Sequence, residues 1–284
     1  MDKKHILFDH TILSYFVFFV LTELCINVFS GIDEFIAGYV EGYGSYLQVN
    51  GQKVLYATGV GCALGAIVAV GLFRLWFRPY FKGCFNGSGL KSGLMSMLPV
   101  LIISFIGSGI SIFQFGSSSI PLAFFHSLAP GFGEEVAFRG IGIANYMRRV
   151  RSEKQLYMIF WLSSIVFGLV HLGNIVAGAD MFSTLVQSVF AIGIGMLFCA
   201  VYLRTGNLWP TVIAHTAIDF VELCRGDLGN SSGLMMDLGP GDYVVMLSAL
   251  VAGILGIVLF RKKYHPQILK VWQEKWSVTE QSLP

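Results

Sequence analysis

This chain contains a series of long apolar runs. Most of them are long enough to cross a membrane as a helix. Crossing about 30 Å of hydrocarbon takes roughly 20 helical residues. We predict eight transmembrane helices from these runs, of which the seventh is the shortest. They cover residues 11–30, 54–77, 94–113, 120–147, 156–174, 182–203, 209–223 and 243–260. An even number of spans places both termini on one side of the membrane.

The fourth run contains charged residues where charge is costly. Its stretch 131–140 reads GFGEEVAFRG and holds Glu134, Glu135 and Arg139. Ionisable residues inside a membrane span mark functional sites by default. On an α-helix Glu135 and Arg139 share a face and can pair, whereas Glu134 lies about 100° round the axis. The pattern predicts one paired carboxylate and one available for chemistry. The competing interpretation is a buried pair that only joins helices.

Two later runs add polar residues within the membrane. His171 lies near the end of the fifth run, and His215 and Asp219 lie four residues apart in the seventh, where the carboxylate can orient the imidazole. At about 1.5 Å per residue from the basic flanks, Glu134, His171 and His215 lie at depths of roughly 21, 26 and 17 Å. Because helices tilt, these depths permit the three side chains to meet in one slab of the membrane.

Composition supports a single integral membrane domain over residues 1–284. Hydrophobic residues make up 55% of the chain and charged residues 13%, against roughly 25% charged in a soluble domain. Mean hydropathy is +0.68. The net charge of +2 is too small to indicate nucleic-acid binding. The lipid bilayer is therefore the expected surrounding, and no nucleic-acid partner is expected.

Basic residues predict the orientation of the chain. They gather in the connection 148–154 and in the carboxyl tail 261–275, and the alternate connections hold mainly acidic residues. The positive-inside rule then places both termini in the cytoplasm. Trp272 and Trp276 lie among lysines in the tail, which is either an amphipathic segment on the inner leaflet or an ordinary anchoring tail.

The chemistry of these residues favours hydrolysis. Glu134 is the candidate general base that activates a water molecule, and His171 and His215 can hold the water or stabilise an oxyanion. Glu134, His171 and His215 could instead bind zinc, since two histidines and a glutamate form a known catalytic zinc site. The sequence has no HExxH motif, so we expect no metal and no cofactor.

Three motifs in these helices resemble those of a known family. They read EExxxR, FxxxH and HxxxD, in that order along the chain. The matching residues are Glu134, Glu135 and Arg139, then Phe167 and His171, then His215 and Asp219. The pattern is similar to that of the CPBP (CAAX protease and bacteriocin-processing, Abi) family of glutamic-type intramembrane endopeptidases. The resemblance implies an all-α membrane protein with a four-helix catalytic core, here residues 120–224.

The resemblance also implies roles for these residues. Glu134 would activate water with His171 as its partner, and His215 and Asp219 would support the oxyanion. Glu135 and Arg139 would shape the site, with Phe167 in support. Eukaryotic prenyl-protein enzymes of the family have Asn where this chain has Asp219. Since an ionised Asp cannot donate a hydrogen bond, we expect Asp219 to orient His215.

The implied function is hydrolysis of a peptide bond in a membrane-associated peptide or protein, with Glu134 activating water. A short chain with basic inner loops is similar to bacterial members, which indicates a bacterial cell membrane. Two alternatives remain. One is a non-catalytic membrane partner that retains the fold, acting in bacteriocin immunity or sensor regulation. The other is a proton- or ion-coupled transporter, which predicts inverted repeats, and we find none in the sequence.

Overall fold

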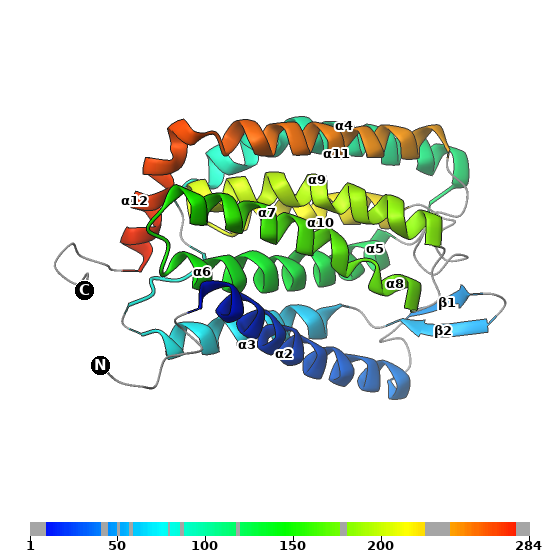
Figure 1. Cartoon of the computed structure of the whole chain (residues 1–284). Coiled ribbons are helices and arrows are strands. Elements are labelled where there is room, and N and C mark those ends of the chain that lie inside the picture. The colour runs from blue at the N-terminus through cyan, green and yellow to red at the C-terminus, as the bar shows by residue number, and fades with distance from the viewer. Residues whose placement is uncertain are drawn as a thin grey trace.

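The structure, a computed structural model, is an all-α bundle with one small β-hairpin at an end. It describes residues 10–40, 45–49, 52–56, 59–78, 80–85, 88–117, 120–176, 181–224 and 239–276. The long helices lie side by side along one axis (Figure 1). The prediction of an all-α polytopic membrane protein is confirmed.

Helical segments stand at all eight predicted positions. They are α2 (Thr11–Tyr39), α3 (Val60–Trp76), α4 (Leu90–Phe115), a composite segment, α7 (Glu153–Val170), α9 (Met181–Thr205), α10 (Trp209–Leu223) and α11 (Pro240–Leu259). The composite segment is α5 (Ile120–Leu128), η2 (Ala129–Glu134), η3 (Val136–Ile143) and α6 (Ala144–Met147).

Five of these segments are long and apolar enough to cross a membrane. They are α2, α4, α7 together with the short α8 (Gly173–Val176), α9 and α11. Helix α3 is apolar but only 17 residues long, and α10 has 15 residues. Helical segments therefore occupy all eight predicted positions, and five of them are long and apolar enough to cross a membrane.

The chain between the first two spans differs from the prediction. Helix α2 continues to Tyr39 rather than ending near residue 30. Strands β1 (Ser45–Val49) and β2 (Gln52–Tyr56) then pair antiparallel, so residues 54–56 are strand and the second helix begins at Val60. The sequence Asn50-Gly51 between two alternating segments is a strong hairpin pattern, which the apolar run concealed.

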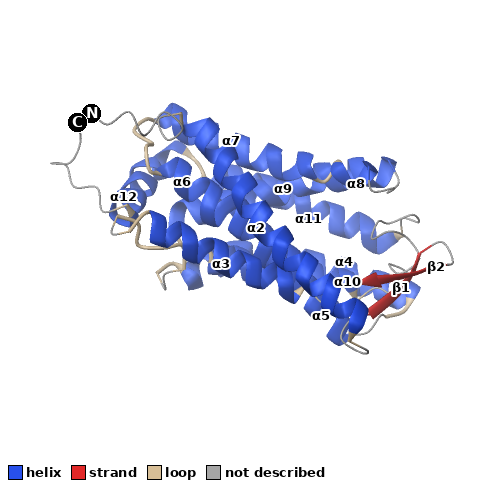
Figure 2. Ribbon diagram, turned by 90° about the horizontal axis from the view of Figure 1, so that it is seen from below, coloured by secondary structure: helices blue, strands red, loops and turns tan. Residues whose placement is uncertain are grey.

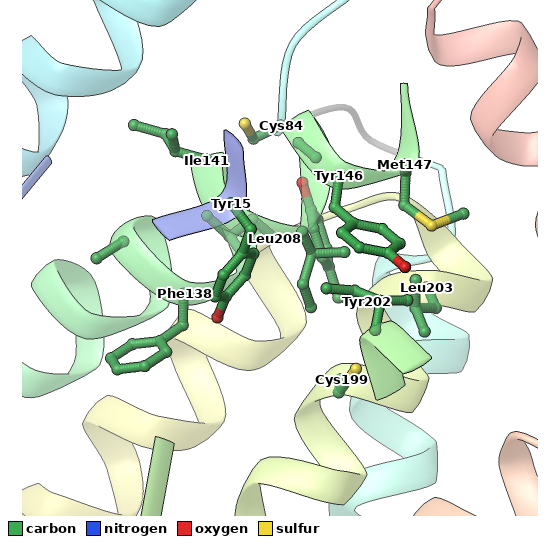
Figure 3. Close-up of a cluster of buried hydrophobic side chains, with 14 of the residues drawn as sticks. Tyr15, Cys84, Phe138, Ile141, Tyr146, Met147, Cys199, Tyr202, Leu203 and Leu208 are labelled. Atoms are coloured by element: carbon green, nitrogen blue, oxygen red, sulfur yellow. The ribbon is translucent and has the colours of Figure 1, made fainter. Parts of the chain in front are cut away.

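Helix α9 forms the centre of the bundle. It packs against α7 on one side and α11 on another, and residues 194–203 are all buried. Helix α2 pairs with α3 and packs on η3 and α6. A cluster of buried aromatic, aliphatic and sulfur side chains joins these elements (Figure 3). In it the Cys84 thiol donates to the carbonyl of Gly140 at 2.8 Å.

The carboxyl-terminal segment closes one end of the bundle as helix α12 (His265–Lys275), opposite the hairpin (Figure 2). Both tail tryptophans are buried against protein. The indole N–H of Trp272 donates to Leu203 O at 2.9 Å, and that of Trp276 donates to Ala144 O at 3.0 Å. The Lys275 ammonium donates to Gly83 O at 2.6 Å, and burial lowers the pKa of this lysine to about 8. The tail therefore uses its tryptophans to pack on the bundle rather than on a leaflet.

Candidate active site

The first motif lies on π-helical turns. Segments η2 and η3 meet at Glu135, so the helix that carries EExxxR is wider than the α-helix assumed from spacing. Pro130 lacks a backbone N–H, which removes one α-helical hydrogen bond at this point. Single π turns within helices are frequent at functional sites. The sequence reasoning missed this feature because apolar periodicity does not separate the two helix types.

Close packing by glycine brings the third motif against the first. A Cβ added to Gly131 would lie 2.0 Å from Thr216 Oγ1 and 2.7 Å from Thr216 Cα. Only glycine therefore allows helix α10 to approach η2 this closely. Thr216 follows His215 directly, so this contact fixes the distance between the histidine and the two glutamates.

The Glu135–Arg139 pair predicted from spacing is present. Arg139 Nη1 donates to Glu135 Oε1 at 2.7 Å, and both side chains are fully buried. The guanidinium carbon lies 4.0 Å from the ring centroid of Phe167, which is a cation–π distance. Phe167 of the second motif thus contacts Arg139 of the first motif.

His215 lies among three carboxylates. Its Nδ1 is 3.0 Å from Glu135 Oε1, and because an ionised carboxylate can only accept, Nδ1–H is the donor. Its Nε2 is 3.4 Å from Asp219 Oδ2 and 4.0 Å from Glu134 Oε2. One nitrogen is therefore anchored, and the other faces Glu134 and Asp219.

Glu134 is the more exposed of the two glutamates and has no arginine or lysine partner among the described residues. Its side chain is 33% exposed, whereas that of Glu135 is 0% exposed. Oxygen Oε2 of Glu134 is buried and has no hydrogen-bond partner among the described residues. Asp219 is 23% exposed, so the face that joins it to Glu134 is accessible.

Phe167 and His171 form the second motif on α7. The buried Phe167 ring lies 5.8 Å from the His215 ring and 5.4 Å from the His171 ring, centroid to centroid. His171 Nδ1 lies 2.9 Å from the carbonyl oxygen of Phe167 and donates to it. No hydrogen bond or ion pair joins His171 to Glu134 in the part of the chain that the structure describes. His171 thus borders the site through Phe167.

The three residues that could have bound zinc, Glu134, His171 and His215, do not form one ligand group in this structure. Among the described residues, no three His, Cys, Asp or Glu side chains form a group that could hold a metal ion. His171 is the donor that lies apart. The residues present do not fit a catalytic zinc, and the expectation of metal-free chemistry stays a prediction.

The contact between Glu135 and His215 could not be found from the sequence. Spacing paired Glu135 with Arg139 and His215 with Asp219, and both pairs face each other within their helices. The 3.0 Å contact of His215 with Glu135 is shorter than its 3.4 Å contact with Asp219. Because this contact joins two helices, no periodicity within either helix indicates it.

Comparison with known proteins places the motif region in a family. Residues 116–221 match the family described as type II CAAX prenyl endopeptidase Rce1-like. No curated protein and no solved structure matches the chain. The matched segment runs from Gly116, just before the composite helix, to Val221 in α10 and contains all three motifs. Over residues 116–221, this integral membrane protein matches the CAAX protease family that its motifs indicated.

Proposed function

We propose that the protein is an intramembrane endopeptidase that hydrolyses a peptide bond in a membrane-associated peptide or protein. The match over residues 116–221 supports a CAAX-type hydrolase. One observation carries the proposal: a partly exposed carboxylate, Glu134, lies 4.0 Å from an imidazole that two other carboxylates hold in place. This arrangement supplies a base beside a hydrogen-bond donor, which is what amide hydrolysis requires.

In this proposal Glu134 removes a proton from a water molecule as the water oxygen attacks the carbonyl carbon of the substrate. His215 Nε2–H stabilises the oxyanion that forms. Glu134 then transfers its proton to the amide nitrogen, and the carbon–nitrogen bond breaks to give an amine and a carboxylic acid. The proton count closes, because the proton taken from water leaves on the amine.

The remaining motif residues position these two groups. Glu135 holds Nδ1 of His215, and Asp219 lies beside Nε2, which keeps the imidazole protonated on the side that faces the substrate. Arg139 neutralises Glu135 and rests on Phe167. His171 donates from Nδ1 to the Phe167 carbonyl, which leaves its Nε2 to interact with a second water or with the substrate.

Variants at the base and at the oxyanion donor test the proposal. Glu134→Gln and His215→Ala are expected to slow cleavage of a fluorogenic prenylated CAAX peptide by at least about 100-fold in detergent micelles. Glu34→Gln is the matched control, because Glu34 is an exposed carboxylate on α2. Cleavage that persists in both site variants at the control's rate would remove the catalytic proposal.

Chelation tests the metal-free chemistry. Activity is expected to survive prolonged treatment with 1,10-phenanthroline and dialysis, because the described site groups no set of three metal ligands. Activity that disappears with the chelator and returns with added zinc would contradict this prediction. The metal content of the dialysed protein, measured by mass spectrometry, distinguishes removal from simple inhibition.

A further inference from the structure

A pocket lies at the α12 end of the bundle, between helix α12 and the segment that follows α6. Figure 1 shows α12 lying across this end of the bundle. Arg148 and Arg151 line the pocket on one side, and Trp272, Gln273 and Trp276 line it on the other. The pocket is partly open and has room for a single water-sized group. It contains no residue of the three motifs, so the proposed hydrolysis does not account for it.

The wall that α12 contributes is fixed by the bundle. Trp272 and Trp276 are both buried, and each indole N–H already donates to a backbone carbonyl, of Leu203 and Ala144 respectively. The two indoles therefore give the pocket an apolar surface. The polar atoms that can meet a ligand come from the arginines and from Gln273. A few polar groups on a largely apolar wall are typical of a ligand-binding pocket.

The charge of the pocket is positive. None of the described residues that line it is acidic. Arg151 Nη1 donates to the carbonyl oxygen of Val150 at 2.9 Å and to that of Arg148 at 3.4 Å, which fixes the guanidinium at the wall. Because a guanidinium carries five N–H groups, Arg151 keeps donors for a ligand. Glu153, the nearby carboxylate along the chain, pairs with Lys262 at 3.1 Å. The pocket therefore suits an anion, and arginine matches the geometry of phosphate in particular.

Exposed aromatic residues place the pocket at the level of a membrane surface. The guanidinium carbon of Arg148 lies 5.2 Å from the ring centroid of Phe77, at the carboxyl end of α3. Trp76, which precedes Phe77, is 69% exposed, and Tyr80 is 63% exposed. Exposed Trp and Tyr side chains at the ends of membrane helices lie at the level of the lipid headgroups. Arg148 is therefore at the depth of the phospholipid phosphates.

We propose that this pocket binds the phosphate group of an anionic phospholipid. One phosphate oxygen enters the pocket and accepts hydrogen bonds from Arg148, Arg151 and Gln273, and the rest of the headgroup stays at the mouth. Basic pockets on the cytoplasmic side of membrane proteins bind such headgroups, and the positive-inside rule predicts that this end is cytoplasmic. Because the polar groups come from both walls, the bound lipid joins α12 to the connection 148–154 and stabilises the folded protein.

Thermal unfolding of the delipidated protein in uncharged detergent micelles tests this proposal without any substrate. Phosphatidylglycerol at about 100-fold above its Kd is expected to raise Tm by about 5 °C. Phosphatidylcholine, whose headgroup has no net charge, and inorganic phosphate at the same concentration should each raise Tm far less. An equal shift with inorganic phosphate would overturn a lipid as the source of the phosphate. An equal shift with phosphatidylcholine, or no shift with phosphatidylglycerol, would overturn the pocket as an anionic-lipid site.

Charge-neutralising variants distinguish the pocket from the basic surface around it. Arg151→Gln is expected to weaken phosphatidylglycerol binding about tenfold in a lipid titration followed by native mass spectrometry, because charge-assisted hydrogen bonds are lost. Lys154→Gln is the matched control. Lys154 is an exposed cation on the same connection and is not among the described residues that line the pocket. Its loss should weaken binding less than about twofold. Equal weakening by the two variants would indicate diffuse attraction and contradict the proposal.

Gln273→Leu tests the part of α12 without changing the charge. Gln273 is exposed, so the variant is expected to fold and to keep the wild-type Tm in the absence of lipid. Its affinity for phosphatidylglycerol should fall about fivefold, because one hydrogen bond to the phosphate is lost. Unchanged affinity in folded Gln273→Leu protein would contradict the bridging of α12 to the connection 148–154.

Discussion

A single carboxylate oxygen links the first and third motifs. Glu135 Oε1 accepts from Arg139 Nη1 at 2.7 Å and from His215 Nδ1 at 3.0 Å. All three side chains are largely or fully buried. The interaction with Arg139 compensates the buried charge of Glu135, and the interaction with His215 orients the imidazole. Stability and activity therefore depend on the same atom in different ways.

Substitutions at this pair should separate the two effects. Arg139→Met leaves the Glu135 carboxylate buried without its cation and is expected to lower the free energy of unfolding by about 3–5 kcal/mol. The double variant Glu135→Leu, Arg139→Met removes both charges and should recover a large part of that loss. Denaturant unfolding in detergent micelles measures both changes.

Activity should not return with stability in that double variant. Leu at position 135 cannot accept from Nδ1 of His215, so the imidazole loses its anchor. Equal destabilisation in the single and double variants would contradict the charge argument. Recovered cleavage in the double variant would contradict the orienting role of Glu135.

At the residue scale, the sequence predicts what lies within one helix. The pairing of Glu135 with Arg139 follows from a spacing of four residues, and so does the orientation of Asp219 toward His215. The contact of Phe19 with Phe138 does not follow, since it depends on how α2 packs against another helix. The roles proposed for these side chains remain predictions.

The composite helix is the element on which the site depends, and its glycines set its packing. Gly131→Ala would bring a methyl group to 2.0 Å from Thr216 Oγ1 and 2.7 Å from the Cα of the same residue. Because backbone atoms are involved, α10 must shift and carry His215 away from Glu135. We expect a loss of about 1–3 kcal/mol of stability and a larger loss of cleavage activity.

Gly109→Ala in α4 is the matched control for this substitution. Nothing lies within 4 Å of a Cβ added there, so stability and activity should be unchanged. Thr216→Ser is not expected to rescue Gly131→Ala, because the serine keeps the hydroxyl and the backbone that clash. Full activity in Gly131→Ala protein would show that the close approach of α10 to η2 is unnecessary for the site.

At the element scale, hydrophobic runs predict where helices lie but not how each one is built. The predicted run 156–174 corresponds closely to α7, whereas 54–77 contains a strand before its helix. The run 120–147 is helical throughout but includes π turns. Apolar composition is common to all of these, so it identifies segments that avoid water without specifying their backbone hydrogen bonds.

At the scale of the whole molecule, the two ends of the bundle differ in structure. Helix α2 begins at the end where α12 lies, and the hairpin β1–β2 lies at the other (Figures 1 and 2). The basic connection 148–154 lies at the α12 end, because it directly follows α6. Trp276, the residue after α12, donates a hydrogen bond to Ala144 of α6. The positive-inside rule therefore favours a cytoplasmic α12 end.

Reporter fusions test this orientation in a bacterial host. Green fluorescent protein joined to the carboxyl terminus is expected to fluoresce, and alkaline phosphatase joined there is expected to be inactive. An epitope inserted between Asn50 and Gly51 should be accessible to protease added to cells with a permeabilised outer membrane. The reverse pattern would mean that the proposed orientation is inverted.

The contacts between α2 and the composite helix predict which positions should evolve together. A large ring at position 15 fits only because position 142 is glycine, and the two positions are distant in sequence. The two positions should therefore covary among homologues, with a smaller side chain at position 15 wherever position 142 is alanine. A chain that inherited only residues 116–221 would leave Gly142 without the aromatic ring that packs against it.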